Sequence, residues 1–397
     1  MEIAEAEAAS HKNEQVLHQR HLPDDLITQH ILPKLPVKSL FKFKSVSKQW
    51  YSTLSSYQFA NTHFKLSPSS HTQFIFIQNR NDFYLFSCND DGDEIGDYCK
   101  KNLLKLGFDF NDEELVLIGS CNGLVCLASF SGYFFVLWNP LTGQFRKYSD
   151  PELLVDSSSS FRVSWGFGYV SVTDDYKVVR ILELNGSLDI WVHVFSLKWN
   201  RWTRMSNEVC QDLISLRTNE RQRLELDHGG ESLFPYSFHS RQGVLVDETL
   251  YWIVSKENGW CRKIVAFNLV LEMFESFICM DLVSNGVYLD KFVFAMGGCL
   301  YKCRVDVRDD IRIDMLKGSG KVDSLRLSRD LRLRSCQGFV GFSRTGKFYI
   351  LLEDSTIGII NPNSEPIKYT PVIHFESLGK SRVTSYVPSL ILPYTVA

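Results

Sequence analysis

A pattern of four short strands separated by turns recurs along most of the chain. Residues 119–148, 241–277 and 338–369 each contain an apolar strand, a turn, an aromatic-containing strand, a further apolar strand and a closing polar strand. Residues 169–205 follow the same plan. Sheets that cannot bury both faces alone pack radially, so the repeat predicts a β-propeller-like domain at residues 73–392. At roughly 45 to 50 residues per blade, about 320 residues give about six or seven blades. A stacked pair of β-sandwiches is the alternative.

The composition agrees with a large strand-rich domain that does not enter a membrane. The 397 residues include 28 Phe and 16 Tyr, and aromatic side chains favour strands. The formal net charge of −3 argues against a protein that binds nucleic acid or membrane surfaces as a whole. No run reaches the roughly 18 uninterrupted apolar residues that a membrane helix needs. Residues 1–20 are acidic and polar without the apolar core of a secretory signal, and are predicted to be disordered or to form a fraying helix.

The ten cysteines carry no spacing typical of a disulfide framework or a zinc site, and no CxxC motif occurs. Many of them lie within apolar runs such as Gly123–Ser129. This usage predicts buried, reduced thiols in a cytoplasmic or nuclear protein. No metal or cofactor is expected.

The N-terminal part of the chain has a different pattern, which begins with a short amphipathic helix. Pro23 fits the first helical position, where its missing N–H has no cost, and two aspartates follow it. Ile27, Ile31 and Leu35 recur every four residues and form one apolar stripe. Pro33 is expected to end the regular helix near the preceding residue.

Two further short helices are predicted directly after it. Pro36 can start the second helix, in which Leu40 and Val46 share a face. Ser47 is a candidate N-cap for a third helix that carries Trp50. The sequence thus predicts a three-helix domain at residues 21–66, and an overall α+β multidomain chain.

A domain of this size has difficulty in folding alone. Below roughly 40 to 70 residues a single core rarely supplies enough stability, and residues 21–66 offer no disulfide or metal site. The apolar faces of its helices must therefore be covered either by the downstream domain or by a second protein. The polar residues 67–72 are predicted to be a linker between the two domains.

The apolar pattern of the helical block resembles the F-box. The residues that carry this resemblance are Leu22-Pro23, Ile31-Leu32, Leu35-Pro36, Leu40, Phe43, Val46-Ser47-Lys48 and Trp50. In that family the motif binds the adaptor subunit of SCF-type cullin–RING ubiquitin ligases. The resemblance implies an adaptor-binding set of Leu22, Pro23, Leu26, Ile27, Ile31, Leu35, Pro36, Leu40, Val46, Lys48 and Trp50. Within this set, Leu40, Val46 and Trp50 are expected to be internal or shared with the core of the domain.

The charge of the same block agrees with an acidic partner. Residues 21–66 contain six lysines and two aspartates, a local excess of four positive charges. Such an excess would steer an acidic adaptor towards the helices. A solvated lysine face without a partner is the alternative.

The strand-rich part resembles the F-box-associated domain found behind F-boxes in plants. The motifs lie within Gly119–Leu127, Leu137–Tyr148, Gly166–Ile181 and Val194–Met205. The resemblance covers roughly residues 115–280 well and the C-terminal third only loosely. It implies a substrate-receptor role and no particular substrate.

Two polar regions are further candidates for target binding. A basic patch for an acidic or phosphorylated target segment could form from Arg326, Arg329, Arg332 and Arg334. The solvated side of an edge strand is the alternative reading of these arginines. Residues 206–240 interrupt the strand rhythm with a long polar stretch, which is either a binding loop or disordered.

No pattern of catalytic residues occurs: the chain has no nucleophile elbow, no zinc-protease motif and no complete phosphate-binding loop. We therefore expect a non-catalytic substrate receptor that binds the SCF adaptor and, through it, the cullin and RING subunits, together with an unknown target protein. A propeller enzyme or lectin and an F-box scaffold without ligase function are the alternatives.

Overall fold

Contacts divide the chain into two compact units, Met1–Ser69 and Ser70–Ala397, which are named here the helical unit and the strand unit. The boundaries expected from the sequence stay predictions. The structure, a computed structural model, describes residues 22–66, 72–79, 82–89, 99–107, 113–150, 161–184, 189–208, 213, 237–238, 240–255, 262–279, 288–296, 298–306, 311–316, 324–327, 336–342, 347–352, 356–361, 368–374 and 382–394. The predicted disorder at residues 1–20 and most of the predicted linker at 67–72 lie outside these residues.

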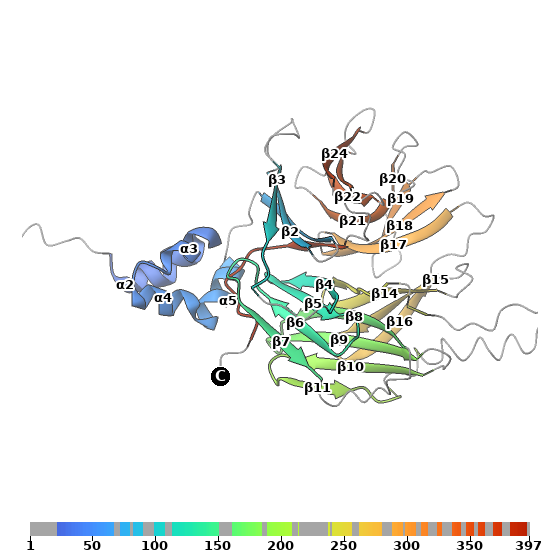
Figure 1. The fold of residues 1–397 in the computed structure, drawn as a ribbon, viewed down its shortest axis with the longest axis horizontal. Helices are drawn as coiled ribbons and strands as arrows, with labels where there is room; N and C mark the ends of the chain where they lie inside the picture. Colours follow the sequence, from blue (N-terminus) through green and yellow to red (C-terminus); the bar gives the residue numbers. More distant parts are fainter. Residues whose placement is uncertain are drawn as a thin grey trace, which may run out of the picture. The chain divides into compact units, whose positions relative to one another are not determined.

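The helical unit consists of short helical segments joined by tight bends (Figure 1). Its first helix runs without a break through α2 (Asp24–Leu26), the π-helical η1 (Ile27–Ile31) and the 3-10 turn η2 (Leu32–Lys34). The regular helix was expected to end near Leu32, and there η1 gives way to the single 3-10 turn η2, whose first positions accept Pro33 because no intrahelical N–H is needed there. It is followed by α3 (Val37–Phe43), α4 (Lys48–Ser55) and α5 (Tyr57–Leu66). The helix α5 was not predicted from the sequence as a separate element.

Side-chain caps define where the last two helices begin. The predicted N-cap is confirmed, since the Ser47 hydroxyl accepts a hydrogen bond from the Trp50 N–H at 3.1 Å. Ser56 makes the same contact with the Phe59 N–H at 3.2 Å and starts α5. Each cap satisfies one of the N–H groups that a helix leaves unpaired at its N-terminus.

The helical unit has a small core of its own. Its buried side chains come from every helix and are Leu32, Pro33, Leu40, Leu54, Phe59, Ala60 and His63. His63 also ties the last helix to the first, because its Nε2 lies 2.9 Å from the carbonyl oxygen of Leu35. Burial lowers the pKa of His63. A neutral imidazole that donates from Nε2 to this carbonyl fits both observations.

The strand unit contains six antiparallel sheets among its described strands. The first three are β25–β1–β2–β3 (Arg382–Tyr386, Thr72–Asn79, Asp82–Asn89, Cys99–Leu104), β4 to β7 (Leu115–Cys121, Leu124–Ser129, Phe134–Trp138, Phe145–Ser149) and β8 to β11 (Phe161–Val170, Asp175–Leu184, Ile190–Ser196, Arg201–Arg204). The others are β12 to β16 (Ser237–Phe238, Val244–Val246, Thr249–Ser255, Arg262–Asn268, Met273–Cys279), β17 to β20 (Tyr288–Met296, Cys299–Asp306, Ile311–Leu316, Ser324–Leu327) and β21 to β24 (Cys336–Phe342, Phe348–Leu352, Thr356–Asn361, Lys368–His374).

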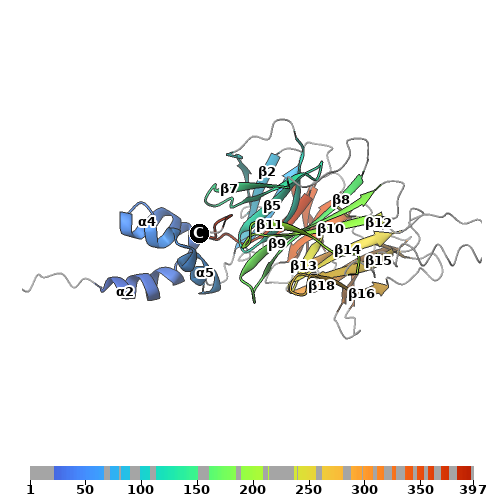
Figure 2. The same cartoon turned by 90° about the horizontal axis from the view of Figure 1, so that it is seen from below.

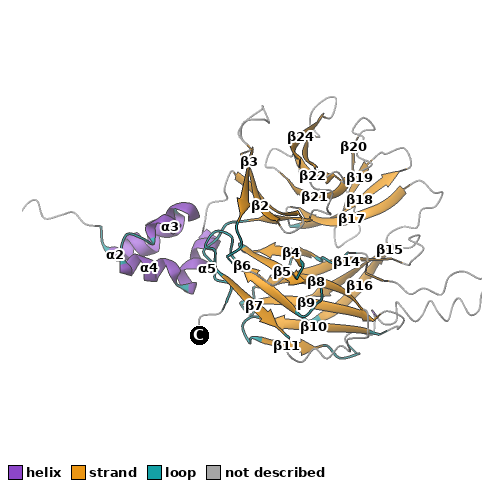
Figure 3. Ribbon diagram, viewed as in Figure 1, coloured by secondary structure: helices purple, strands orange, loops and turns teal. Residues whose placement is uncertain are grey.

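These sheets form a closed ring. Their innermost strands contact one another in the order β25, β4, β8, β13, β17, β21 and back to β25. The sheets β4–β7 and β8–β11, for example, lie side by side in two views (Figure 1, Figure 2). The ring is a six-bladed β-propeller, which agrees with the predicted architecture and removes the sandwich alternative. The named elements of the strand unit are strands (Figure 3).

The two ends of the strand unit close the ring together. β25 pairs with β1 in antiparallel register, with Phe74 opposite Tyr386. The chain then continues along the β4–β7 blade as residues 387–394, named here the C-terminal segment. The Asn139 amide donates to the carbonyls of Ser389 and Ile391 at 3.0 and 2.8 Å, and the Ser389 hydroxyl donates to the carbonyl of Asn122 at 2.7 Å. Three apolar side chains of the segment are buried: Leu390, Ile391 and Leu392.

Among the described residues, the structure has no helix with the length and apolar character needed to cross a membrane.

Candidate functional site

The first helix of the helical unit leaves apolar side chains exposed. Leu22, Leu26 and Ile31 are 56 %, 44 % and 39 % exposed. The two prolines Pro23 and Pro36 are exposed as well. We name the stretch 22–36 that carries these side chains the helical surface. A partner that covers large aliphatic side chains at this exposure removes apolar surface from water, which lowers the free energy of the complex.

Local backbone geometry produces this surface. The carbonyl of Pro23 accepts hydrogen bonds from the N–H groups of Leu26 and Ile27 at 3.0 and 3.2 Å, so the helix begins directly after the proline. The wider π-turn that follows rotates the chain between Ile31, which is exposed, and Leu32, which is 1 % exposed. Short π-helical segments are frequent at functional sites.

The opposite side of the same helix holds the surface in place. Leu32 and Pro33 are buried in the core of the unit, and the carbonyl of Leu35 is bound by His63. Ile27 and Leu35 are half-buried between the two sides. The core of the unit is thus formed without the exposed side chains, which remain available to another protein.

The remaining residues of the predicted adaptor-binding set lie in different environments. Leu40 is fully buried and belongs to the core of the helical unit. Trp50 is half-buried and packs edge-on against Phe43, with ring centroids 5.7 Å apart. Val46 and Lys48 are exposed. Their contact with an adaptor stays a prediction.

Several lysines lie within the helical surface or shortly after it in the sequence. Lys34, Lys38, Lys42 and Lys48 are exposed, whereas Lys44 is half-buried. Burial lowers the pKa of Lys44. The exposed ammonium groups can attract an acidic partner, and this attraction weakens with salt because they are solvated.

Two features of the helical unit were not predicted from the sequence. His63 was not recognised as a core residue, although its position four residues after Phe59 repeats the apolar spacing of a helix. Tyr51 is 60 % exposed on α4 and adds to the apolar surface of the unit. Only the solvent exposure of Tyr51 distinguishes it from an ordinary helix residue.

Among the candidates for target binding, the described residues include one of the four arginines and a small part of residues 206–240. Arg326 lies in β20, the outer edge strand of its sheet, opposite Arg312 of β19. Arg329, Arg332 and Arg334 lie outside the described residues, so the predicted basic patch stays a prediction. Most of residues 206–240 also lies outside them. Within that stretch Leu213 and Phe238 are buried in the core between two blades.

No group of three or more His, Cys, Asp or Glu side chains that could hold a metal ion occurs among the described residues. Of the cysteines in this part of the chain, Cys126 and Cys303 are buried, and Cys121 and Cys299 are partly buried. Burial raises the pKa of Cys121 to about 12, which keeps this thiol protonated and unreactive.

Comparisons with known families match both units. The family described as the F-box domain matches residues 20–61, and the family described as the F-box associated beta propeller domain matches residues 73–293. The second match alone covers more than half of the chain.

Curated relatives are named as F-box proteins. F-box protein CPR1 of Arabidopsis thaliana is 30% identical over 299 residues, which cover 70% of this chain and 65% of the relative. The putative F-box protein At3g16210 of the same plant is 27% identical over 320 residues, which cover 78% of this chain and 75% of the relative. The F-box/kelch-repeat protein At3g23880 is 29% identical over 64% of each chain. The chain thus spans just under two thirds of the first of these relatives.

Proposed function

The chain belongs to the F-box proteins that carry an F-box associated beta propeller domain, and from this premise we propose that it is a substrate-recognition subunit of an SCF-type ubiquitin ligase. The F-box binds the adaptor subunit, and the adaptor links the chain to the cullin and RING subunits. The propeller binds a target protein. The other subunits of the ligase carry out ubiquitin transfer.

The observation that carries this proposal is the helical surface. A small helical unit has completed its core with Leu32, Leu40 and Leu54, yet exposes Leu22 and Ile31 to solvent. Exposed aliphatic side chains of this kind are costly unless a partner covers them. The surface therefore supports the binding of another polypeptide by the F-box.

The contribution of such a chain to the reaction is proximity. Binding the adaptor and the target at once converts an encounter between two proteins into one within a complex, with an effective concentration in the millimolar range for short flexible connections. The role requires no acid, base or nucleophile in this chain. Positioning alone raises the rate of a step whose chemistry lies elsewhere.

The first test is co-purification of the full chain with an SCF adaptor. The double variant Leu22→Ala with Pro23→Ala removes apolar side chains from the helical surface without touching the buried core. We expect at least a thirtyfold weaker complex, because losing about 2 kcal/mol of apolar burial corresponds to that factor. The matched control is Leu103→Ala on β3, since Leu103 is 57 % exposed and Leu22 is 56 % exposed.

Unchanged co-purification of the double variant would contradict adaptor binding through the helical surface. Reconstitution of the complete ligase then tests the catalytic context, with ubiquitin transfer to the chain itself as the readout. A complex that forms but never supports transfer would identify a scaffold rather than a ligase receptor. Full transfer by a chain that lacks residues 1–66 would refute the receptor role of the F-box.

A further inference from the structure

Four hairpin turns of two neighbouring blades are joined into one surface, which we name the turn face. They are residues 171–174 and 197–200 of the β8–β11 blade, and residues 247–248 and 269–272 of the β12–β16 blade. Each of these turns connects consecutive strands of its sheet. Hydrogen bonds between the turns show that they meet at the same end of the propeller.

Three hydrogen bonds run directly from turn to turn. The Lys198 ammonium donates to the carbonyl of Thr173 at 2.7 Å within one blade. Between the blades, the Ser171 N–H donates to the Glu248 carboxylate at 2.6 Å. Within the β12–β16 blade, the Leu269 N–H donates to the Glu248 carbonyl at 2.9 Å. Glu248 therefore connects the turns of both blades.

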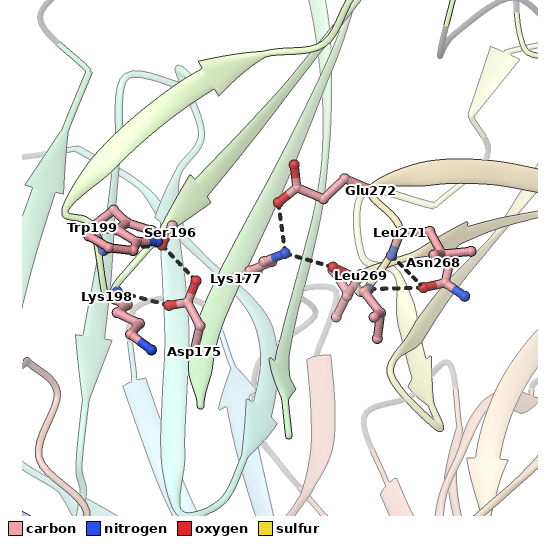
Figure 4. A network of polar contacts seen from close by, with 10 residues as sticks. Asp175, Lys177, Ser196, Lys198, Trp199, Asn268, Leu269, Leu271 and Glu272 are labelled. Atoms are coloured by element: carbon pink, nitrogen blue, oxygen red, sulfur yellow. Dashed lines mark hydrogen bonds and ion pairs between the residues drawn. The ribbon is translucent and has the colours of Figure 1, made fainter. Parts of the chain in front are cut away.

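A buried lysine adds a second connection between the blades, as Figure 4 shows. Lys177 of β9 is 6 % exposed, donates to the carbonyl of Leu269 at 2.7 Å, and pairs with the Glu272 carboxylate at 2.7 Å. Asp175 on the same strand accepts hydrogen bonds from the Ser196 hydroxyl at 2.6 Å and the Lys198 N–H at 2.8 Å. Charged hydrogen bonds in a buried setting hold the turns in one conformation.

The backbone of the turn face is strained. Positive φ angles occur at Asp174 (50°), Asn200 (49°), Asp247 (45°), Glu248 (61°) and Glu272 (52°). Asparagine and aspartate tolerate this region, but glutamate has no such preference. Strain of this type persists only where surrounding contacts enforce it, and it is frequent in binding sites.

Apolar side chains project from this rigid frame. Val172 is 80 %, Trp199 is 68 % and Leu271 is 63 % exposed, and Val270 beside Leu271 is exposed as well. Polar residues are the usual occupants of hairpin turns. A tryptophan on a rigid turn offers a large contact area at small entropic cost, which is the property of interface hot spots.

The neighbouring blade indicates what type of ligand fits this end of the propeller. The C-terminal segment lies there outside any helix or strand, and its Ser389 hydroxyl donates to the carbonyl of Asn122 in the turn between β4 and β5. The Asn122 amide in turn donates to the Tyr176 hydroxyl of the β8–β11 blade at 3.1 Å. The turn face thus continues a surface on which a segment with buried apolar side chains already lies.

Charge distinguishes the turn face from an ordinary apolar patch. Its turns carry four carboxylates, at Asp174, Asp247, Glu248 and Glu272, against the single ammonium of Lys198. Arg201 at the start of β11 adds one cation at its edge. Asp175 and Lys177 beneath the turns cancel each other in net charge. A partner with positive charges is complementary to this arrangement.

We propose that the turn face binds an extended segment of the target protein in which apolar side chains alternate with lysine or arginine. This inference rests on the proposed function, and it defines the chemistry of the target segment that such a receptor would recognise. The apolar side chains of the segment contact Trp199, Val172 and Leu271, and its cations lie near the carboxylates.

The test measures binding of fluorescein-labelled peptides of about twelve residues to the full chain by fluorescence anisotropy. One peptide alternates leucine with lysine and arginine, the second replaces the cations with glutamate, and the third replaces leucine with serine. The first peptide should bind with a Kd below 1 mM, at least tenfold more tightly than the other two. Raising the salt from about 0.1 M to 0.5 M should weaken its binding several-fold. Absence of binding, or equal binding of the three peptides, would overturn the proposal.

Variants of the turn face test whether the peptide binds there. Trp199→Ala and Leu271→Ser should each weaken the first peptide at least tenfold, and Asp247→Asn should weaken it about two- to threefold and reduce its salt dependence. The control Leu103→Ser, an exposed leucine of another blade, should leave the Kd unchanged. Equal affinity of wild type and Trp199→Ala would refute the proposed surface. Adaptor co-purification of the same variants separates the two proposals, because it should be normal whether or not the peptide binds.

Discussion

A buried arginine between two blades gives a quantitative test of how the propeller is held together. Arg180 of β9 is completely buried, donates to the Asp150 carboxylate at 2.5 Å, and donates to the carbonyl of Gly132 at 3.1 Å. Its guanidinium lies 4.4 Å from the ring centroid of Trp202. Burial lowers the pKa of Arg180, and the hydrogen bond that its guanidinium donates to Asp150 opposes that shift. The pair joins the β8–β11 blade to the residues flanking β7.

The variant Arg180→Met keeps most of the side-chain volume and removes the charge. Asp150 is 5 % exposed in its side chain, so its carboxylate would remain buried without the guanidinium. Breaking a buried ion pair by removing one partner costs about 3–5 kcal/mol. The unfolding entropy of about 330 residues is roughly 0.7 kcal/mol/K, so we expect Tm of the strand unit to fall by about 4–7 °C.

Differential scanning calorimetry of the full chain measures this change. The double variant Arg180→Met with Asp150→Leu should recover most of the loss, because an apolar pair of similar volume often replaces a buried ion pair without cost. A single variant with Tm within 1 °C of the wild type would refute the reasoning. So would a double variant that is less stable than the single one.

Three further predictions concern other parts of the chain. Burial, aided by a nearby guanidinium, lowers the pKa of His193 to about 4. The stability that its neutral form contributes is present above about pH 6.5 and is lost as the pH falls towards 4, so urea unfolding should show about 2 kcal/mol less stability from this group at pH 5 than at pH 7. Ser47→Ala should cost the helical unit about 1 kcal/mol, measured by circular dichroism during urea unfolding. Gly123→Ala should release the C-terminal segment, since a Cβ there would meet the Ser389 side chain and lie 2.8 Å from the Val387 carbonyl oxygen; limited proteolysis would detect the release.

Matched variants serve as controls for these three predictions. His193→Gln should remove the stated part of the pH dependence, and an unchanged profile would contradict the assignment. Ser52→Ala, on the same helix as the capped turn, should have little effect, and an equal loss would show that the cap is not responsible. Gly143→Ala has a similar positive φ of 74° but no atom within 4 Å of the added Cβ. It should leave the C-terminal segment bound, and release by both variants would point to strain rather than collision.

Sequence patterns of short range predicted much of the fold correctly. The N-cap at Ser47 and the helix after Pro36 depend on residues within one turn, and both occur in the structure. The repeats at 119–148 and 338–369 each correspond to most of one sheet. Strands that follow one another in sequence pair as hairpins, so a local repeat can predict a whole blade. The pairing of β25 with β1 was not predicted, since the two strands lie at opposite ends of the strand unit and no local signal connects them.

The same contrast applies to the candidate sites. The sequence predicted an apolar stripe of Ile27, Ile31 and Leu35 from its helical spacing, but only Ile31 of these is exposed, beside Leu22 and Leu26. The turn face is not visible in the sequence, because the bond between Ser171 and Glu248 joins residues 77 positions apart. In sequence, Trp199 and Leu271 look like ordinary residues at strand ends. Only the closed ring brings their turns together.

Hydrogen–deuterium exchange of the full chain, with and without a saturating SCF adaptor, tests the central claim about the helical surface most directly. Amides of residues 22–36 should exchange at least tenfold more slowly in the complex, and amides of the turn face should exchange at unchanged rates. Exchange in residues 22–36 that does not change when the adaptor is bound would contradict the claim that these exposed side chains are the docking surface.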